Sequence, residues 1–487
     1  MMHINNLRDI MLSKTQVKKL NIIYQLRSGS VLISILEKKC KVSRKELKRI
    51  ITIINEEVTE LQMFNISNDL IYVIEEEVQL NREISDEMYC FIMTKLRKNY
   101  LLSSGVYKAL LFALEERKFM ILDLSDFLFY SDSYTYKIIK KIDLFFYYLE
   151  SDIKLTKKNN KYLITGSEIS LITFHFLLAM LVSDEETWIF KNVKKNCHVY
   201  YVNKSKKKQL LVPLNQTRPK VLLAVFEVSK IKGRSISSAS YINNRIGKIM
   251  FNEEVYSLDW EIRLLNNNEQ LYRSFFIHYF CQELRDKQQK RIIGKKLSEY
   301  SNDDKLVSVI VDFLNDIKKY YCLSDKHYYE VLYTIYKHII VIHHLELYRY
   351  MCNDDCMVKE AKIVQSLEEV VKKHFNKYSN EKSYSQLKCS LMPIVISYIQ
   401  LNNIQSKKVY VEFNHHSEYR AMIINKLKLH YSEKVLKIVD DYRNADIIIG
   451  DCTCINQNRK IFVYHGRPDS STWNCLKEFL NELLYIQ

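Results

Sequence analysis

The stretch SDSYTYKIIKKI, residues 131–142, contains the pattern that decides the local fold. Ser131 or Ser133 can cap the start of a helix, because a serine hydroxyl accepts a hydrogen bond from a backbone N–H of the first turn. Apolar residues then recur at helical spacing and predict a core-facing side, formed by Ile138, Ile142, Phe145 and Leu149. The opposite side carries Ser133, Lys137, Lys140 and Lys141. The stretch therefore predicts an amphipathic helix with one basic face.

The segments on both sides of this helix predict a helix-turn-helix unit with a wing. Residues 100–117 are expected to form one helix, and residues 122–130 a short helix with Ser125 as its N-cap. After the basic helix, DIKLTKKNNKYLITG, residues 152–166, predicts a strand, a turn and a second strand that Gly166 ends. A helix-turn-helix followed by a β-hairpin is a common DNA-binding arrangement.

The same order is predicted once before, in residues 17–74. Residues 17–29 and 30–40 predict two helices, and the Ser43–Glu46 spacing of a capping box predicts the start of a third. On this third helix Lys45, Lys48, Arg49 and Thr52 lie opposite an apolar side made of Leu47, Ile50, Ile51, Ile54 and Val58. Residues 62–74 predict two short strands around a turn at 67–69. The sequence leaves open which of the two units dominates.

The composition favours a polyanionic partner. The chain has 487 residues, a formal charge of +16 and only 8 Gly and 4 Pro, so helices are expected to outnumber strands. One basic amphipathic helix is more often a solvated face, but two capped and winged units favour double-stranded DNA. The lysines are expected to hold phosphates, and Arg49, Ser133 and Tyr136 are the better candidates for base edges.

The remaining chain predicts helical bundles followed by an α/β tail. Residues 170–401 are expected to be almost wholly helical, with enough helix for two bundles. Residues 191–234, which include KSKKK, are interpreted as a solvated basic loop rather than a second nucleic-acid contact. From residue 407 onwards strands alternate with helices, which predicts a small parallel sheet.

Several classes of function find no support in the sequence. The start has no signal-peptide pattern, and the longest apolar run, residues 171–182, is too short to span a bilayer, so a cytoplasmic protein is expected. The 11 Cys fit reduced thiols, and the pairs Cys352/Cys356 and Cys452/Cys454 lack a matching second pair. Neither a metal nor a cofactor is expected. No phosphate-binding glycine loop or catalytic motif is present, so a non-enzymatic protein is expected.

The order of these parts resembles the Mga/AtxA-type transcription regulators of low-GC Gram-positive bacteria. The sharpest local part is residues 124–168, whose helix-turn-helix is followed by YLITGSE, similar to the family's i-x-G-x-E element. The resemblance implies a mainly α fold with two winged helix-turn-helix units at 1–80 and 81–168, bundles of the PRD type (regulatory domains of the sugar phosphotransferase system) at 169–290 and 291–403, and a tail at 404–487 similar to that system's IIB component.

The same resemblance implies a homodimeric DNA-binding regulator, usually an activator of surface, virulence or carbohydrate-linked genes. In such regulators a phosphocarrier protein phosphorylates bundle histidines, and the candidates here are His198, His278, His338 and His374. An active IIB domain has a cysteine after its first strand, whereas this chain has FNHHSEY at 413–419. The tail is therefore expected to serve assembly or sensing.

Three other interpretations remain. An RNA-binding antiterminator also carries paired bundles, but it would have a small β-rich domain at its N-terminus. A replication initiator with two winged helices would leave the bundles and the tail without a role. An assembly protein with incidental basic faces is the non-DNA alternative.

Overall fold

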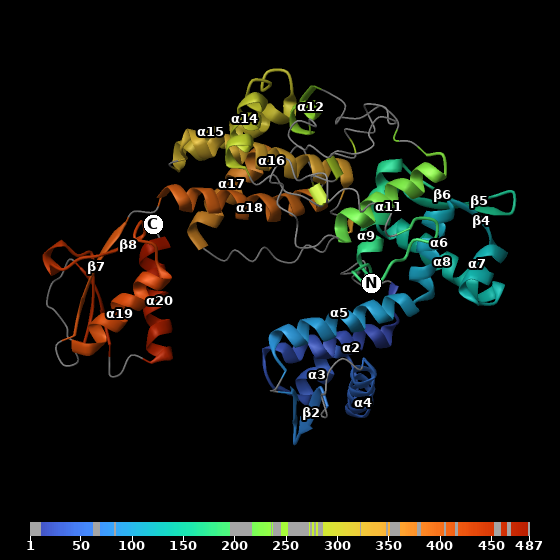
Figure 1. Ribbon diagram of the computed structural model, residues 1–487, viewed down its shortest axis with the longest axis horizontal. Coiled ribbons are helices and arrows are strands. Elements are labelled where there is room, and N and C mark those ends of the chain that lie inside the picture. Colours follow the sequence, from blue (N-terminus) through green and yellow to red (C-terminus); the bar gives the residue numbers. More distant parts are fainter. Residues whose placement is uncertain are drawn as a thin grey trace. The chain divides into compact units, whose positions relative to one another are not determined.

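The computed structural model is mainly helical (Figure 1). It describes residues 11–487 except 62–68, 82–83, 195–216, 235, 237–244, 252–271, 273–274, 277–278, 281–285, 322, 347–348, 351–360, 377–380, 404–405, 414–416, 452–458, 465–468 and 486–487. The chain divides into two compact units. The first comprises Met1–Gln289, Ile339–Asp355 and Glu381–Gln386, and the second comprises Lys290–His338, Cys356–Asn380 and Leu387–Gln487.

Two modules in the first unit share one order of elements. The first module is α2 (Lys14–Gln25), β1 (Val31–Leu32), α3 (Ile33–Cys40), α4 (Arg44–Glu60), β2 (Ile71–Ile74) and β3 (Glu77–Leu80). The second is α6 (Gly105–Glu116), β4 (Lys118–Met120), α7 (Ile121–Leu128), α8 (Asp132–Tyr148), β5 (Lys154–Lys158) and β6 (Lys161–Thr165). Their antiparallel sheets have the equivalent strand orders β1-β3-β2 and β4-β6-β5. Helix α5 (Asp86–Ser103) lies between the modules in the chain.

Three local predictions for these modules were wrong. The helix predicted at 100–117 is split at Ser104, whose backbone is extended and whose hydroxyl caps α6 by accepting from the Tyr107 N–H. Ser125 lies inside α7 and donates to the Ile121 carbonyl at 3.0 Å, so it is not an N-cap. The described hairpin of the first module is formed by residues 71–80, so its turn is not the one predicted at 67–69; residues 62–68 of the predicted hairpin lie outside the described residues. Its turn lies at Glu75, which has a positive φ of 52°.

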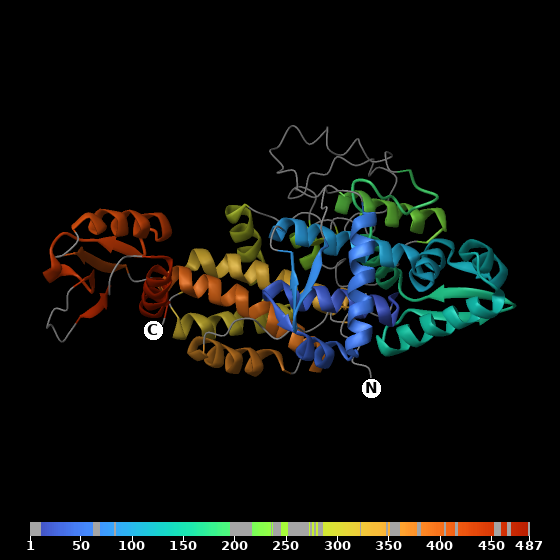
Figure 2. The same ribbon diagram turned by 90° about the horizontal axis from the view of Figure 1, so that it is seen from below.

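The second hairpin lies where the sequence predicts it. Strands β5 and β6 pair from Lys154↔Thr165 to Lys158↔Lys161. Asn159 and Asn160 form the turn with φ values of 50° and 58°, which asparagine tolerates better than most residues. The hairpin packs against α8 through β5, and Figure 2 shows these teal elements at the right.

Helix α8 is anchored in the second module by its apolar face. Ile138, Ile142, Phe145 and Phe146 are each at most 2% exposed, and the helix packs against α6 and α7. Phe145 and Phe146 also contact the ring of Phe174, with centroid distances of 5.9 and 5.3 Å. Phe174 belongs to α9 (Glu168–Met180). Leu149, predicted to lie on this face, is half-buried.

A buried ion pair joins the second module to the helices that follow it. The Arg117 guanidinium, 4% exposed, contacts the Glu168 carboxylate at 2.9 Å. The Ser229 hydroxyl donates to the same carboxylate at 2.6 Å from α11 (Thr217–Ile231). Glu168 is the acidic residue of the YLITGSE element. Since a buried carboxylate needs such partners, this residue fixes the start of α9 against both neighbours.

The other helices continue the predicted helical region. They are α12 (Arg245–Phe251), α14 (Lys287–Ser298), α15 (Lys305–Tyr320), α16 (Asp325–Leu345), α17 (Ala361–Phe375) and α18 (Glu381–Asn403). Gly294 lets α14 approach α16, because a Cβ atom there would lie 2.0 Å from the Tyr329 carbonyl oxygen. The predicted loop at 191–234 is partly wrong: residues 217–231 form α11, with Pro219 in its first turn, where proline is tolerated. KSKKK lies outside the described residues.

The C-terminal part forms the predicted parallel sheet. Its strands are β7 (Lys407–Glu412), β8 (Leu436–Ile438), β9 (Ile447–Gly450) and β10 (Lys460–Val463), in the order β10-β9-β7-β8. All three pairings are parallel. Helices α19 (Ser417–His430) and α20 (Ser470–Tyr485) complete the core with Ile423, Leu427, Leu476 and Leu480. Strands β7 and β9 lie at the centre of this order. The chain adds β8 on one side of β7 and then β9 and β10 on the other side, so the point at which it changes sides lies between β7 and β9.

The core of the first unit contains a buried histidine ring whose nitrogens have no hydrogen-bond partner. His175 on α9 is fully buried, neither ring nitrogen has a hydrogen bond, and the ring packs 5.5 Å from that of Phe190. Burial, assisted by the Arg117 charge, lowers the pKa of His175 to about 3. The histidine is therefore neutral in the folded protein at neutral pH.

The burial of His175 predicts that acid destabilises the wild type more than it destabilises His175→Leu. The unfolded histidine titrates near its ordinary pKa of about 6.5, so acid protonates the unfolded state first. The wild type should then lose stability as the pH falls from about 6.5 towards the folded pKa of about 3, and none of this loss should occur above that window. Melting temperatures of both proteins between pH 7.5 and 4.5 test this. Equal losses in the two proteins would contradict it.

Candidate nucleic-acid interface

Helix α8 presents all the contact residues predicted for the second module on one exposed face. The Ser131 hydroxyl caps the helix by accepting from the Tyr134 N–H at 3.4 Å, so Ser131 rather than Ser133 is the N-cap. The exposed residues include Ser133, Tyr136, Lys137, Lys140 and Lys141. Because the apolar side of the helix is packed in the module, this polar side faces solvent.

The adjacent hairpin extends the basic face, which the sequence reasoning missed. Four lysines of β5 and β6 are exposed: Lys154, Lys157, Lys158 and Lys161. The Lys157 ammonium lies 5.9 Å from the ring centroid of Tyr136 on α8 and 5.7 Å from that of Tyr162 on β6. The available signal was the run KLTKKNNK, in which lysines flank the turn on both strands. Helix and hairpin together offer a continuous cationic surface with an aromatic ring between them.

Helix α4 presents an equivalent face in the first module. The Ser43 hydroxyl accepts from the Glu46 N–H at 3.3 Å, which confirms the predicted start. Lys45, Lys48 and Arg49 are exposed. The Glu46 carboxylate pairs with Lys18 of α2 at 2.8 Å, and the hydrogen bond from Lys18 is the main reason that the pKa of Glu46 is lowered.

The first hairpin has the opposite charge to the second. Glu75, Glu76 and Glu77 occupy its turn and the start of β3, and residues 71–80 contain no basic residue. Glu76 pairs with Arg44 at the start of α4 at 2.6 Å. The hairpin is held to α4 by Asn55, whose amide donates to the Ile71 carbonyl and accepts from the Ile71 N–H, each at 3.0 Å. Acidic groups therefore reduce the positive potential beside α4.

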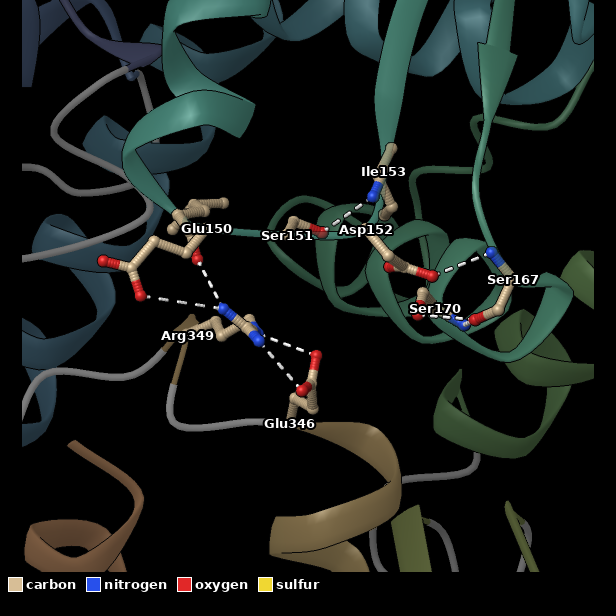
Figure 3. A network of polar contacts seen from close by, with 9 residues as sticks. Glu150, Ser151, Asp152, Ile153, Ser167, Ser170, Glu346 and Arg349 are labelled. Carbon is tan, nitrogen blue, oxygen red and sulfur yellow. Dashed lines mark hydrogen bonds and ion pairs between the residues drawn. The ribbon is translucent and has the colours of Figure 1, made fainter. Parts of the chain in front are cut away.

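A segment from far along the chain holds the end of α8 (Figure 3). The Arg349 guanidinium donates to the Leu149 carbonyl, which follows the last residue of α8, at 3.3 Å, and lies 4.0 Å from the Glu150 carboxylate. Two further bonds, of 2.7 and 2.9 Å, fix the guanidinium on Glu346. A cation at this position complements the negative end of the helix dipole.

The loop beyond α8 is ordered by its own polar contacts. The Ser151 hydroxyl accepts from the Ile153 N–H at 3.1 Å, and Asp152 accepts from the Ser167 N–H at 2.8 Å (Figure 3).

Tyr350, next to Arg349, is 8% exposed and stacks on Phe174 at 5.6 Å. Burial raises the pKa of Tyr350 to about 12. The rings of Phe174 and Tyr350 thus continue the aromatic core under α8.

The four candidate histidines have different surroundings. His374 on α17 is 13% exposed, and its Nε2 lies 2.8 Å from the Asp316 carboxylate of α15. Lys373 also contacts Asp316, at 2.6 Å. Hydrogen bonds from Lys373 and His374 lower the pKa of Asp316. His338 is half-buried on α16. His198 and His278 lie outside the described residues.

The segments that follow β7 and β9 at the carboxyl edge of the C-terminal sheet are outside the part of the chain that the structure describes. Residues 414–416, which follow β7, and residues 452–458, which follow β9 and include Cys452 and Cys454, lie outside the described residues, as do Cys352 and Cys356. Among the residues that the structure describes, no His/Cys/Asp/Glu group could hold a metal ion. Within the same residues no helix is long and apolar enough to cross a membrane.

Comparisons with known proteins supply no further identification. No protein-family model matches the chain, and no functionally characterised protein matches it significantly.

The Arg349 contacts predict that Arg349→Ala loosens the end of α8. Removing the guanidinium leaves the Leu149 carbonyl without this donor, which costs about 1 kcal/mol. Hydrogen exchange of the backbone amides in residues 146–153 should then speed up roughly fivefold. Arg443→Ala is a matched control, because Arg443 pairs with Asp441 on the exposed surface of the C-terminal sheet. Unchanged exchange in Arg349→Ala would show that the contact does not order this segment.

Proposed function

We propose that this protein is a DNA-binding transcription regulator of the Mga/AtxA type whose main DNA contact is made by the second module. The observation that carries the proposal is the exposed face of α8, where Lys137, Lys140 and Lys141 are joined by the hairpin lysines around Tyr136. Each module is proposed to be a winged helix-turn-helix, with α8 as the recognition helix and the β5–β6 hairpin as the wing. Lysines hold phosphates, while Ser133 and Tyr136 are near enough to the helix start to reach base edges.

The difference between the two hairpins supports giving the second module the main role. DNA binding is dominated by neutralisation of phosphates, so a wing with four lysines contributes where one with three glutamates repels. In the first module Arg44 and Lys18 are already paired with acids. Lys45, Lys48 and Arg49 are exposed and are proposed to make a weaker, auxiliary contact.

The rest of the proposal follows from the resemblance in the sequence. The helices from α9 to α18 would form PRD-type regulatory bundles, and the parallel C-terminal sheet would be the IIB-like domain. The regulator would act in the cytoplasm as a homodimer, as an activator and without enzymatic activity. The strand order β10-β9-β7-β8 is compatible with an IIB-like domain, and the missing cysteine at 413–419 favours a role in assembly or sensing.

Alanine at Lys137, Lys140 and Lys141 should strongly weaken DNA binding. Each lost phosphate contact should lower the slope of log affinity against log salt by about one. The measurement is a gel-shift titration in a salt series, on duplexes that the wild type selects from a random pool. Alanine at Lys428, Lys434 and Lys437 is the control, because it removes the same charge from exposed positions on the C-terminal domain.

Equal binding by the wild type and the α8 triple variant would remove the proposed role of this helix. A wild type that selects no duplex would refute DNA binding as a whole. Preference for folded RNA over duplex DNA in competition would favour the antiterminator interpretation instead.

Among the four histidines, we propose His374 as the first phosphorylation candidate. A carboxylate on one ring nitrogen fixes the orientation of the imidazole and leaves the other nitrogen as the nucleophile. Asp316 is placed for this role, and Lys373 beside it can pair with an incoming phosphoryl group. In the transfer, the bond from phosphorus to the carrier's histidine breaks and a bond from phosphorus to His374 forms. With His374 13% exposed, the carrier must approach closely at the end of α17.

This role predicts that His374→Ala reduces labelling when the protein is incubated with the phosphotransferase enzymes and labelled phosphoenolpyruvate. Asp316→Asn should slow the labelling, because the amide holds the ring without its charge. His430→Ala, an exposed histidine of the C-terminal domain, is the control. Full labelling of His374→Ala would place the phosphoryl group elsewhere, and an unlabelled wild type would exclude this form of regulation.

A further inference from the structure

An aromatic residue stands almost fully in solvent at the turn between α7 and α8. The side chain of Phe129 is 93% exposed, the highest value among the exposed large hydrophobic residues of the described chain. Its backbone has a φ of 57°, in the left-handed region. This conformation costs a residue with a side chain about 1 kcal/mol or more, and exposing a whole phenyl ring forgoes the stabilisation of burial. Burial therefore does not stabilise the folded chain through the Phe129 ring.

The turn that carries Phe129 is held from two sides. The Tyr130 N–H donates to the Ser125 carbonyl at 3.1 Å. The Tyr130 ring lies against α6, where a Cβ on Gly105 would be only 2.7 Å from it. Its other side meets the Tyr134 ring edge-on at 5.0 Å. Tyr130, itself 37% exposed, therefore contacts both α6 and α8, and Phe129 is the next residue before it in this turn.

The charges around the turn indicate which part of a DNA duplex each part of α8 could contact. Asp126 and Asp132 flank it and would repel phosphates. The lysines begin one turn further along α8, at Lys137. Tyr134, which is 48% exposed, lies between the acidic and the basic part. Phosphate contacts are therefore expected from Lys137 onwards, while the start of the helix offers aromatic rather than basic side chains.

We propose that Phe129, assisted by Tyr134, recognises thymine methyl groups in the major groove. This inference rests on the proposed function and adds a specificity determinant to it. The thymine methyl is the apolar feature of the major groove and is read by apolar side chains such as phenylalanine. The contact of the Phe129 ring with a methyl group needs no positive charge. The preferred operator should then contain thymine at the position facing the start of α8.

The test compares two forms of the same selected duplex, one with thymine and one with uracil at every thymine position. Uracil lacks only the methyl group, and burying one methyl group changes affinity by about fourfold. The wild type should bind the uracil duplex roughly fourfold to twentyfold more weakly, for one or two methyl contacts. Phe129→Ala should bind the thymine duplex more weakly by a similar factor and should distinguish the two forms clearly less than the wild type does.

Two further variants make the comparison specific. Tyr147→Ala removes another highly exposed aromatic side chain, 77% exposed near the other end of α8, and should keep the wild-type preference. Phe129→Leu retains an apolar side chain and should keep part of it. Uracil also alters DNA shape, but such an effect would appear equally in Phe129→Ala, so only the difference between the proteins reports the methyl contact.

The outcomes separate this inference from the function on which it rests. If the wild type binds and the α8 lysine variant does not, yet Phe129→Ala distinguishes thymine from uracil as the wild type does, only the methyl contact is overturned. If Phe129→Ala weakens both duplexes equally relative to the wild type, Phe129 acts on something other than the methyl group, and the inference is again overturned. If the wild type selects no duplex, the proposed function and this inference both fail.

Discussion

The burial of the apolar side of α8 is the constraint on which the candidate interface depends. Ile138, Ile142, Phe145 and Phe146 are packed in the module and against Phe174. Each such side chain stabilises the packed arrangement by about 1.5–3 kcal/mol, so rotating the helix to bury other residues would cost several times that amount. The rotation of the helix is thereby set, and with it the row of polar and basic side chains that solvent, or a nucleic acid, can reach.

The two modules have the same order of helices and strands and the same strand order in their sheets, but their hairpins carry opposite charge. The Asn159–Asn160 turn joins two lysine-bearing strands, whereas the Glu75–Glu76 turn joins strands without any base. Surface charge contributes little to the stability of such a unit, so it can differ without changing the fold. It contributes strongly to the binding of a polyanion. The common architecture and the different hairpins thus fit one main and one auxiliary contact.

Contacts between distant parts of the chain support the end of α8. Arg349 holds the Leu149 carbonyl, and Tyr350 extends the aromatic core through Phe174. The buried Arg117–Glu168 pair similarly ties the module to α9, and breaking it would leave an unpaired buried charge. A displacement of the segment at 346–350 would therefore act directly on the helix that we propose to read DNA. The regulation that we propose for the helical region could act through these contacts within the first unit.

Features that depend on local chemistry could be predicted from the sequence: the start and faces of α8, the hairpin at 154–165 and the alternation of strands and helices after residue 407. Caps, helical periodicity and turn-forming asparagines act within a few residues and can be recognised without a partner. Three features were found only in the folded chain: the break at Ser104, the place of Ser125 inside α7 and the first hairpin, where Asn55 binds Ile71. Tertiary structure also decided the approach of Lys157 to Tyr136 and of Arg349 to Leu149. The contacts of Asn55, Lys157 and Arg349 join residues well separated in the chain, and no local pattern encodes which distant groups will meet. The bonds of Ser104 and Ser125, in contrast, span only three and four residues, and the sequence offered competing helix starts there.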